Sequence, residues 1–171
     1  AIKNRDNIQA VILASAINHG GRAVNYTAPN PNAQAKVIIE AYNKAKINPR
    51  SVSYIEAHGT GTAIGDPVEI SGLTKAFREF TEEKQFCPIG SVKSNIGHLE
   101  AAAGMAALTK VVLMLQHQEL VPSIHSEEEN PKINFKNSAF YIQKTCEPWR
   151  KPVIVEEEVL VSAPRRAGIS A

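Results

Sequence analysis

The sequence is poor in cysteine and in net charge, and each shortage excludes a class of protein. Its 171 residues contain 2 cysteines, Cys87 and Cys146, too few for a disulfide framework or a zinc set. Its 19 basic and 17 acidic residues leave a formal charge of only +2, which disfavours binding to nucleic acid or to an anionic membrane surface. We therefore expect a protein of a reducing compartment, the cytoplasm, with no metal site and no nucleic-acid partner.

Long apolar runs are also absent. The longest apolar segment, Leu99–Leu115, is shorter than the roughly 20 residues of a membrane span and contains Glu100 and Lys110, so it predicts a buried helix. Residues 1–10 are polar where a signal peptide needs an apolar core, and no signal peptide is expected. With 43% apolar and 21% charged residues, the composition is that of a globular protein, and the length alone fits one domain.

The order of the apolar segments predicts an α/β fold with a parallel central sheet. Continuous apolar runs bounded by polar residues are typical of strands that are covered on both faces, and apolar residues at helical spacing lie between these runs. Helices are expected to pack on the faces of the sheet. The expected elements are strands at Ile8–Ile17, Val52–Ala57, Cys87–Val92 and, more weakly, Phe140–Ile142, and helices over 32–48, 66–80 and 99–117.

Two of the predicted helices have recognisable starts. Asn32 has the chemistry of an N-cap, and it follows a loop stiffened by Pro29 and Pro31. The sequence Asp66-Pro67-Val68-Glu69 combines an acidic N-cap, a proline at the first helical position and the glutamate of a capping box. We therefore expect these helices to begin at Asn32 and Asp66.

The first candidate site follows the strand at Val52–Ala57, where the chain reads His58-Gly-Thr60-Gly-Thr62. Ligands of parallel α/β sheets gather at the carboxyl ends of strands, and two threonine hydroxyls can bond an amide-bearing ligand. The segment lacks the lysine-serine end of a P-loop, so it is not expected to cradle phosphate. From the residues alone, a glycine turn with an ordinary hydrogen-bonded histidine is an equal alternative.

The second candidate site follows the strand at Cys87–Val92 and contains Lys93 and His98 in a turn before a helix. A helix N-terminus favours a neutral imidazole, so His98 can donate a hydrogen bond to a developing oxyanion. Lys93 can hold an anionic group or orient a neighbour. An exposed lysine and a histidine that only caps the helix are the alternative at this point.

Two blocks of the sequence resemble the signature blocks of β-ketoacyl synthase (ketosynthase) domains of modular polyketide synthases. They are EAHGTGTAIGDPVE at Glu56–Glu69 and GSVKSNIGHLEAAAG at Gly90–Gly104. The likeness continues through NYTAPNPNAQ, VPSIH, NPKINFKNSAFYI and PRRAGIS. The first of these four segments resembles synthases served by a free-standing acyltransferase, the trans-acyltransferase type. The resemblance implies a thiolase-like α/β fold, of which this chain would form the C-terminal half of the layered αβαβα architecture.

The resemblance implies an acyltransferase that performs decarboxylative Claisen condensation. His58 and His98 match the two catalytic histidines, which hydrogen-bond the malonyl thioester oxygen as enolate charge develops. Lys93 matches the lysine that orders the second histidine, and Thr60 and Thr62 match the hydroxyls that bond the amides of phosphopantetheine. One strand-helix-strand unit separates the two histidines, so adjacent strand ends can bring both rings to one oxygen.

The family's nucleophilic cysteine has no counterpart in this sequence. In the family it lies in a TACSSS-type elbow upstream of every segment matched here, and neither Cys87 nor Cys146 has that context, so both are expected to be ordinary thiols. Residues 1–171 are therefore expected to be the C-terminal portion of a ketosynthase domain, truncated before its final glycine-rich segment. Alone, this portion is expected to be inactive.

The resemblance also implies partners and leaves alternative functions open. A phosphopantetheine arm on an acyl carrier protein would deliver the substrate, and the domain itself would bind no cofactor. The complete domain would be a homodimer among neighbouring synthase modules. The alternatives are a non-elongating domain that transfers acyl chains or serves as a scaffold, and a fatty-acid β-ketoacyl synthase. Retention of His58 favours condensation, because non-elongating relatives often lack that histidine.

Overall fold

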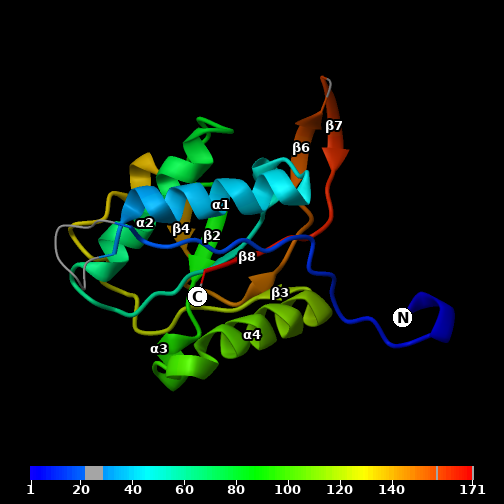
Figure 1. Cartoon of the computed structure of the whole chain (residues 1–171), viewed down its shortest axis with the longest axis horizontal. Helices are drawn as coiled ribbons and strands as arrows, with labels where there is room; N and C mark the ends of the chain where they lie inside the picture. The colour runs from blue at the N-terminus through cyan, green and yellow to red at the C-terminus, as the bar shows by residue number, and fades with distance from the viewer. Residues whose placement is uncertain (22–28, 157, 171) are drawn as a thin grey trace.

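The computed structural model describes residues 1–21, 29–156 and 158–170, which form a sheet with helices on both faces (Figure 1). In these residues the sheet has the strand order β4-β2-β1-β8, and every pairing within it is parallel. Its strands are β1 (Ile55–Glu56), β2 (Cys87–Gly90), β4 (Phe140–Ile142) and β8 (Gly168–Ile169). The predicted parallel sheet is confirmed, although β1 and β2 are shorter than the apolar runs that predicted them.

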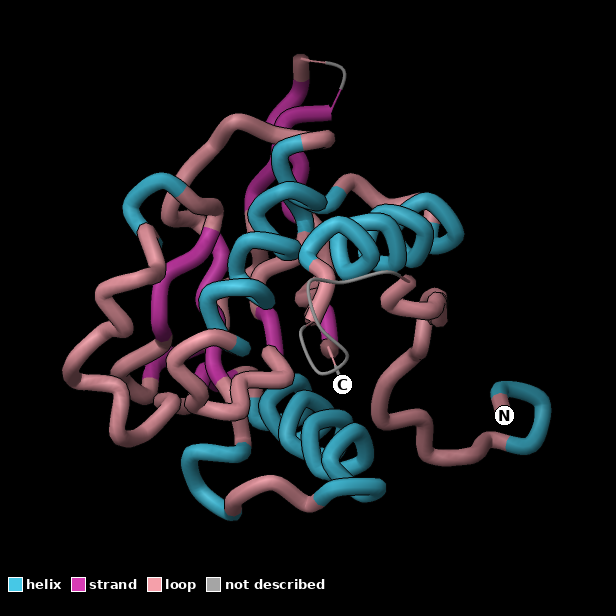
Figure 2. The backbone as a smooth tube through the Cα atoms, turned by 60° about the vertical axis from the view of Figure 1, so that its left-hand side comes forward, coloured by secondary structure: helices cyan, strands magenta, loops and turns pink. Residues whose placement is uncertain are grey.

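Helices α1 and α2 pack on one face of this sheet, and α4 packs on the other (Figure 2). The helices of the described residues are α1 (Pro31–Ala45), α2 (Gly65–Arg78), α3 (Lys93–Ile96) and α4 (Ala103–His117), with short 3-10 turns η1 (Ile2–Asn4), η2 (Pro49–Ser51), η3 (Glu100–Ala102) and η4 (Phe135–Asn137). None of these described helices is long and apolar enough to cross a bilayer.

Two further strand pairs in the described residues lie outside the central sheet, and both are antiparallel. They are β3 (Glu119–Leu120) with β5 (Glu147–Pro148), and β6 (Val153–Glu156) with β7 (Val159–Ser162). The β6–β7 pair projects away from the helices and the sheet in Figure 1. The sequence predicted none of these strands, because two- to four-residue strands carry almost no periodic signal.

Successive residues before and in β1 point to opposite faces of the sheet, as strand geometry requires. Ile55 belongs to the core beneath α1 and α2, whereas Tyr54 belongs to the core beneath α4, and both are fully buried. Phe77 of α2 occupies the first core, with its ring centroid 4.8 Å from that of Phe140 and 5.6 Å from that of Tyr42. Both helical layers therefore pack against adjacent residues at β1, on its opposite faces.

The start of α1 differs from the sequence prediction. Its N-cap is Asn30 and not Asn32, and the Asn30 side chain accepts hydrogen bonds from the backbone nitrogens of Asn32 and Ala33. Pro31 takes the first helical position, where its missing N–H leaves no donor unsatisfied. Residues 22–28 of the predicted preceding loop lie outside the described residues.

The predicted strand at Ile8–Ile17 is wrong, since the structure places no strand there. Its side chains are largely exposed, with Val11 71% and Ile17 92% accessible. A strand must pair its backbone groups with a neighbour, and residues 8–17 pair with no strand of the described sheet β4-β2-β1-β8. The segment instead borders a groove of about 770 Å³ together with apolar residues of α1 and α4.

The predicted buried helix over 99–117 is correct only in part. It begins at Ala103, after the η3 turn, and Ala107, Val111 and Met114 on one side of it are buried. Met105 is 63% exposed, so the opposite side is not covered in this structure. An apolar run gives the length of a helix, but it cannot say how many of its sides are covered.

Replacement of Phe77 tests the core beneath α1 and α2. We expect Phe77→Ala to lower the free energy of unfolding by about 3–5 kcal/mol, because it leaves a cavity beside Tyr42 and Phe140. Phe80→Ala is the matched control, since Phe80 is 37% exposed just beyond α2, and its loss is expected to be about 1 kcal/mol. Chemical denaturation measures both, and equal losses would contradict the central place of Phe77 in this core.

Candidate active site

The five predicted site residues lie on two segments that leave the same edge of the sheet, and Lys93 begins the short helix α3 of the second. His58, Thr60 and Thr62 follow β1, while Lys93 and His98 follow β2. Glu56 at the end of β1 pairs in register with Gly90 at the end of β2, and parallel neighbours place their carboxyl ends together. The ring centroids of His58 and His98 are 5.2 Å apart, at an interplanar angle of 82°. The predicted meeting of the two histidines is confirmed.

The His58 loop is held by two carboxylates from the first turns of α2. Buried Glu69 accepts hydrogen bonds from the backbone nitrogens of His58 at 2.7 Å and Gly59 at 2.9 Å. Asp66 accepts a hydrogen bond from the backbone nitrogen of Gly61 at 3.1 Å. Burial raises the pKa of Glu69, whereas the hydrogen bonds that it accepts oppose that rise.

These contacts overturn the predicted capping box. The N-cap position of α2 is Ile64, and Asp66 and Glu69 lie inside the helix. Their carboxylates bond the loop before the helix and not the helix terminus, because the loop presents unpaired N–H groups directly opposite them. The helix start is bonded by Thr62 instead, whose hydroxyl accepts from the backbone nitrogen of Gly65 at 3.0 Å.

Gly59 allows the two loops to touch. It has a φ of +49°, and a Cβ atom at this position would lie 2.7 Å from the Cβ of Ser91. The Ser91 hydroxyl reaches the Gly59 carbonyl at 3.4 Å. The loops after β1 and β2 therefore meet through backbone and small side chains, which fixes the distance between them.

The tautomer of His98 follows from its surroundings. Its Nδ1 accepts a hydrogen bond from the backbone nitrogen of Glu100 at 2.9 Å. A neutral imidazole that accepts at Nδ1 carries its proton at Nε2, so the exposed ring presents an N–H donor to the site. The sequence predicted a neutral donor at the start of the long helix, but the residue that fixes the tautomer belongs to the η3 turn.

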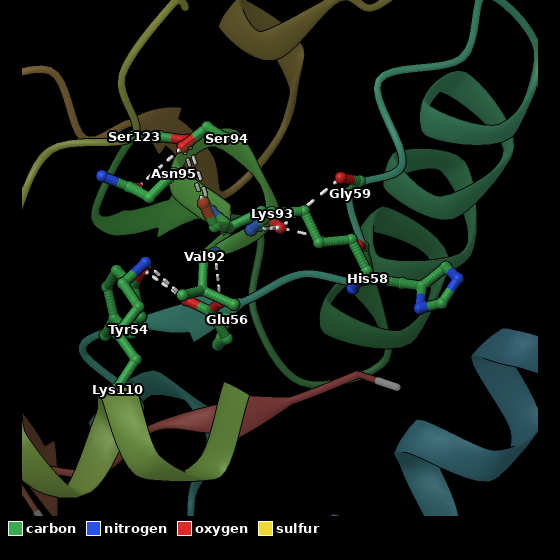
Figure 3. A network of polar contacts seen from close by, with 11 residues as sticks. Tyr54, Glu56, His58, Gly59, Val92, Lys93, Ser94, Asn95, Lys110 and Ser123 are labelled. Carbon is green, nitrogen blue, oxygen red and sulfur yellow. Dashed lines mark hydrogen bonds and ion pairs between the residues drawn. The ribbon is translucent and has the colours of Figure 1, made fainter. Parts of the chain in front are cut away.

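His58 is held in its neutral form by burial and by charge. Burial is the largest cause of its lowered pKa, the ammonium of Lys93 and the neighbouring His98 ring act in the same direction, and the Asp66 carboxylate opposes them. Its Nδ1 is buried without a hydrogen-bond partner among the described residues. Figure 3 shows half-buried Lys93 beside the His58–Gly59 loop, a position from which its charge disfavours imidazolium.

Thr60 and Thr62 form a pair of neighbouring hydroxyls at the outer side of the His58 loop. Their Oγ1 atoms are 3.2 Å apart, and either can be the donor. Thr60 is half-buried and Thr62 is exposed, so the pair faces outward at the rim of the loop. This arrangement can bond an amide group, which has one donor and one acceptor.

Neither cysteine lies in this site. Cys87 stands at the amino end of β2, away from the loops, and burial raises the pKa of its thiol, which disfavours the thiolate. Cys146 is an exposed free cysteine in the irregular segment between β4 and β5. In the described part of the chain, no group of three histidine, cysteine or acidic residues is placed to hold a metal ion.

The carboxylates that support the loops were not recognised from the sequence. The sequence identified Glu69 and Asp66 only as helix-capping residues. Their hydrogen-bond partners are backbone N–H groups of the loop after β1, which local sequence patterns do not indicate. Glu56 carried a signal that could have been used, since it is a charged residue in an otherwise apolar predicted strand. Such a residue, when it is fully buried, requires partners.

Titration of the imidazoles tests the electrostatics of the site. We expect His58 to titrate below its ordinary pKa of 6.5, and Lys93→Met to raise that pKa without restoring 6.5, since burial is the larger cause. Between pH 6.5 and the lower pKa of the folded state, His58 is protonated in the unfolded chain but not in the folded chain. The free energy of unfolding is therefore highest above pH 6.5, and it decreases as the pH falls from 6.5 to the folded-state pKa. NMR of the histidine rings measures the shift. Lys132→Met, at an exposed lysine elsewhere, is the control, and an equal response to both variants would refute the role of Lys93.

Substitution of two glycines tests the contact between the loops. Gly61 also has a positive φ, of +72°, but no atom lies within 4 Å of the place that a Cβ would take there. We expect Gly61→Ala to cost about 1–2 kcal/mol from backbone strain. Gly59→Ala adds the clash with Ser91, worth roughly a further 1–3 kcal/mol. Denaturation of the two variants gives the comparison, and equal stability would show that the close approach is not a constraint.

The structure is similar to solved ketosynthase domains. The oxazolomycin ketosynthase domain OzmH KS7 of Streptomyces albus JA3453 is 46% identical, with a TM-score of 0.90 over 98% of this chain and 28% of that chain. The ketosynthase from module 6 of the bacillaene synthase of Bacillus subtilis 168 is 43% identical, with a TM-score of 0.84 over 87% of this chain and 27% of that chain. The predicted thiolase-like fold is confirmed.

Comparison of the sequence with known proteins also finds polyketide synthases. Polyketide synthase PksL of Bacillus subtilis is 53% identical over 171 residues, which are 100% of this chain and 4% of that protein. Polyketide synthase ThaG of Burkholderia thailandensis is 49% identical over 172 residues, 100% of this chain and 3% of that protein. The chain thus spans a small share of these relatives. Residues 9–127 match the family described as beta-ketoacyl synthase, C-terminal domain. With the paired histidine loops, this match shows that the chain belongs to the β-ketoacyl synthase family, in the form found in the ketosynthase domains of polyketide synthases.

Proposed function

We propose that this chain supplies the histidine-bearing part of a ketosynthase that performs decarboxylative Claisen condensation. The observation that carries the proposal is the meeting of the His58 and His98 rings at 5.2 Å on neighbouring strand ends. The rest of the domain would supply the nucleophilic cysteine, because neither Cys87 nor Cys146 lies in the site. By itself the chain is therefore expected to be inactive.

The two histidines would stabilise the enolate that decarboxylation creates. As the bond to carbon dioxide breaks, its electron pair moves into the malonyl unit, and negative charge develops on the thioester oxygen. The Nε2–H of His98 can donate to that oxygen, because Nδ1 is occupied by the Glu100 nitrogen. His58 is the second neutral ring beside it, and preorganised donors of this kind stabilise developing charge without reorganisation.

The carbanion then forms the new carbon–carbon bond. It attacks the acyl thioester on the cysteine of the remaining domain, and the cysteine sulfur leaves as thiolate. Lys93 serves this chemistry by disfavouring protonation of His58, since its charge lowers the pKa of that ring. A neutral histidine keeps one ring nitrogen free of a proton and remains a donor over the physiological pH range.

The substrate would arrive on the phosphopantetheine arm of an acyl carrier protein. The hydroxyls of Thr60 and Thr62, 3.2 Å apart, are suited to the amides of that arm, and the chain itself would hold no cofactor. The proposal extends to a homodimeric, cytoplasmic complete domain beside other synthase modules, of the trans-acyltransferase type that the NYTAPNPNAQ segment resembles. A non-elongating acyl-transferring or scaffolding domain and a fatty-acid synthase are the alternative functions.

Decarboxylation tests the assignment of the first histidine. In a complete ketosynthase domain that contains this sequence, we expect His58→Ala to slow decarboxylation of a malonyl carrier-protein thioester by about 10²-fold or more, as for the loss of an oxyanion donor. His117→Ala, at an exposed histidine at the end of α4, is the control and should keep the parental rate. Carbon dioxide release is the measurement. An unchanged rate in His58→Ala would remove His58 from the mechanism, and a parent that is acylated but never decarboxylates would indicate a non-elongating domain.

A further inference from the structure

A buried group of charged and polar side chains lies directly beneath the two histidine loops. Glu56 ends β1 with its side chain 0% exposed, and Lys110 of α4 reaches it at 2.7 Å with its side chain 10% exposed. Tyr54, also buried, donates its hydroxyl to Glu56 at 2.8 Å and accepts from Lys110 at 2.8 Å. Figure 3 shows the three side chains converging below the turn at Val92.

The carboxylate of Glu56 connects three segments. One of its oxygens accepts hydrogen bonds from the Lys110 ammonium and the Tyr54 hydroxyl. The other accepts a hydrogen bond from the backbone N–H of Val92 at 2.6 Å. Val92 is the N-cap residue of α3 and its own side chain makes no capping hydrogen bond, while the Ser91 hydroxyl accepts the Lys93 N–H at 3.3 Å. The backbone N–H of Val92, just before Lys93, therefore donates to the carboxylate of a residue in β1, the strand beside β2.

This group is placed to control the distance between the histidines. Glu56 lies two residues before His58, and Val92 begins the turn that leads to His98. Lys110 lies on α4, the helix that follows that turn. Glu56 is therefore in contact with the base of both loops, while Glu56, Tyr54 and Lys110 lie outside the pair of histidine rings.

Stability alone does not explain a charged pair at this position. Burying a carboxylate and an ammonium away from water costs free energy that their mutual attraction often does not offset. Replacing such a pair with apolar residues therefore often leaves the stability of the protein unchanged or increases it. Burial and the charge of Glu56 also raise the pKa of Tyr54, so its hydroxyl keeps the proton that it donates. What an apolar replacement cannot provide is the acceptor for the Val92 N–H.

We propose that Glu56 and Lys110 are positioning residues, which hold the His58 and His98 loops at the separation that the condensation requires. Glu56 acts by accepting the Val92 N–H, and Lys110 acts by neutralising the carboxylate that does so. The consequence for catalysis rests on the proposed function. The positioning itself is a property of the fold and can be observed without turnover.

Three variants separate positioning from charge. Lys110→Met leaves the Glu56 carboxylate without its cation. The double variant Glu56→Gln/Lys110→Met is neutral and retains a side-chain oxygen for the Val92 N–H and an amide that can donate to the Tyr54 hydroxyl. The matched control Glu56→Ala/Lys110→Met is equally neutral but has no acceptor. Tyr54→Phe, which removes one hydroxyl and keeps the ring, is a milder fourth variant should any of the others fail to fold.

The measurements are made on a complete ketosynthase domain that contains this sequence. Ring NMR gives the pKa of His58 and the tautomer of His98, calorimetry gives Tm, and carbon dioxide release and acylation of the nucleophilic cysteine give the two half-reactions. We expect Lys110→Met and the alanine double variant to lose at least about tenfold in decarboxylation, in line with the cost of small misplacements in active sites. The glutamine double variant should recover most of that loss, and acylation should be retained in every variant. Tyr54→Phe should show a smaller loss in the same direction.

Two results would overturn the proposal. One is equal decarboxylation by the glutamine and alanine double variants, which would show that the acceptor for Val92 is not what matters. The other is a loss of both half-reactions in proportion to Tm, which would reduce the pair to a structural role. If the parental domain does not decarboxylate at all, the proposed function fails, and the His58 pKa and His98 tautomer in the same variants still decide whether the pair positions the loops.

Discussion

The site depends on the parallel pairing of β1 with β2. With Glu56 opposite Gly90, the two strands end level with each other, and the loops that follow begin only one strand spacing apart. An antiparallel pair would send these loops to opposite edges of the sheet. Helix α2 connects the two strands across one face, and α4 packs on the other face, so the pairing also fixes where both helical layers begin.

Carboxylates that accept backbone N–H groups give the site its rigidity. Glu69 and Asp66 hold the loop after β1, and Glu56 holds the turn after β2. Charge-assisted hydrogen bonds of this kind are shorter and stronger than those between neutral groups. The charged groups that hold the two loops therefore lie below or beside the His58 and His98 rings.

The sequence predicted which loops come together better than it predicted the bounds of the elements. His58 and His98 became candidates because they follow predicted strands, whose carboxyl ends gather ligands in parallel α/β sheets, and the resemblance to ketosynthases then singled them out. The strand at Ile8–Ile17 was wrong because an apolar run does not specify the backbone pairing that a strand requires, and here the run borders a groove. The capping box failed for a similar reason, since Glu69 bonds a loop ten and eleven residues away in the chain.

The sequence by itself determined the family, the parallel α/β order and the residues of the two loops, because these depend on local patterns of apolar residues, glycine and histidine. The tertiary structure decided which groups those residues meet. It placed the Glu100 nitrogen on His98 and so selected a tautomer, it placed Lys93 near His58, and it joined Glu56 to Lys110 across more than fifty positions of the chain. Each of these is a contact that the order of residues does not specify, and only the folded backbone brings the two groups within reach of each other.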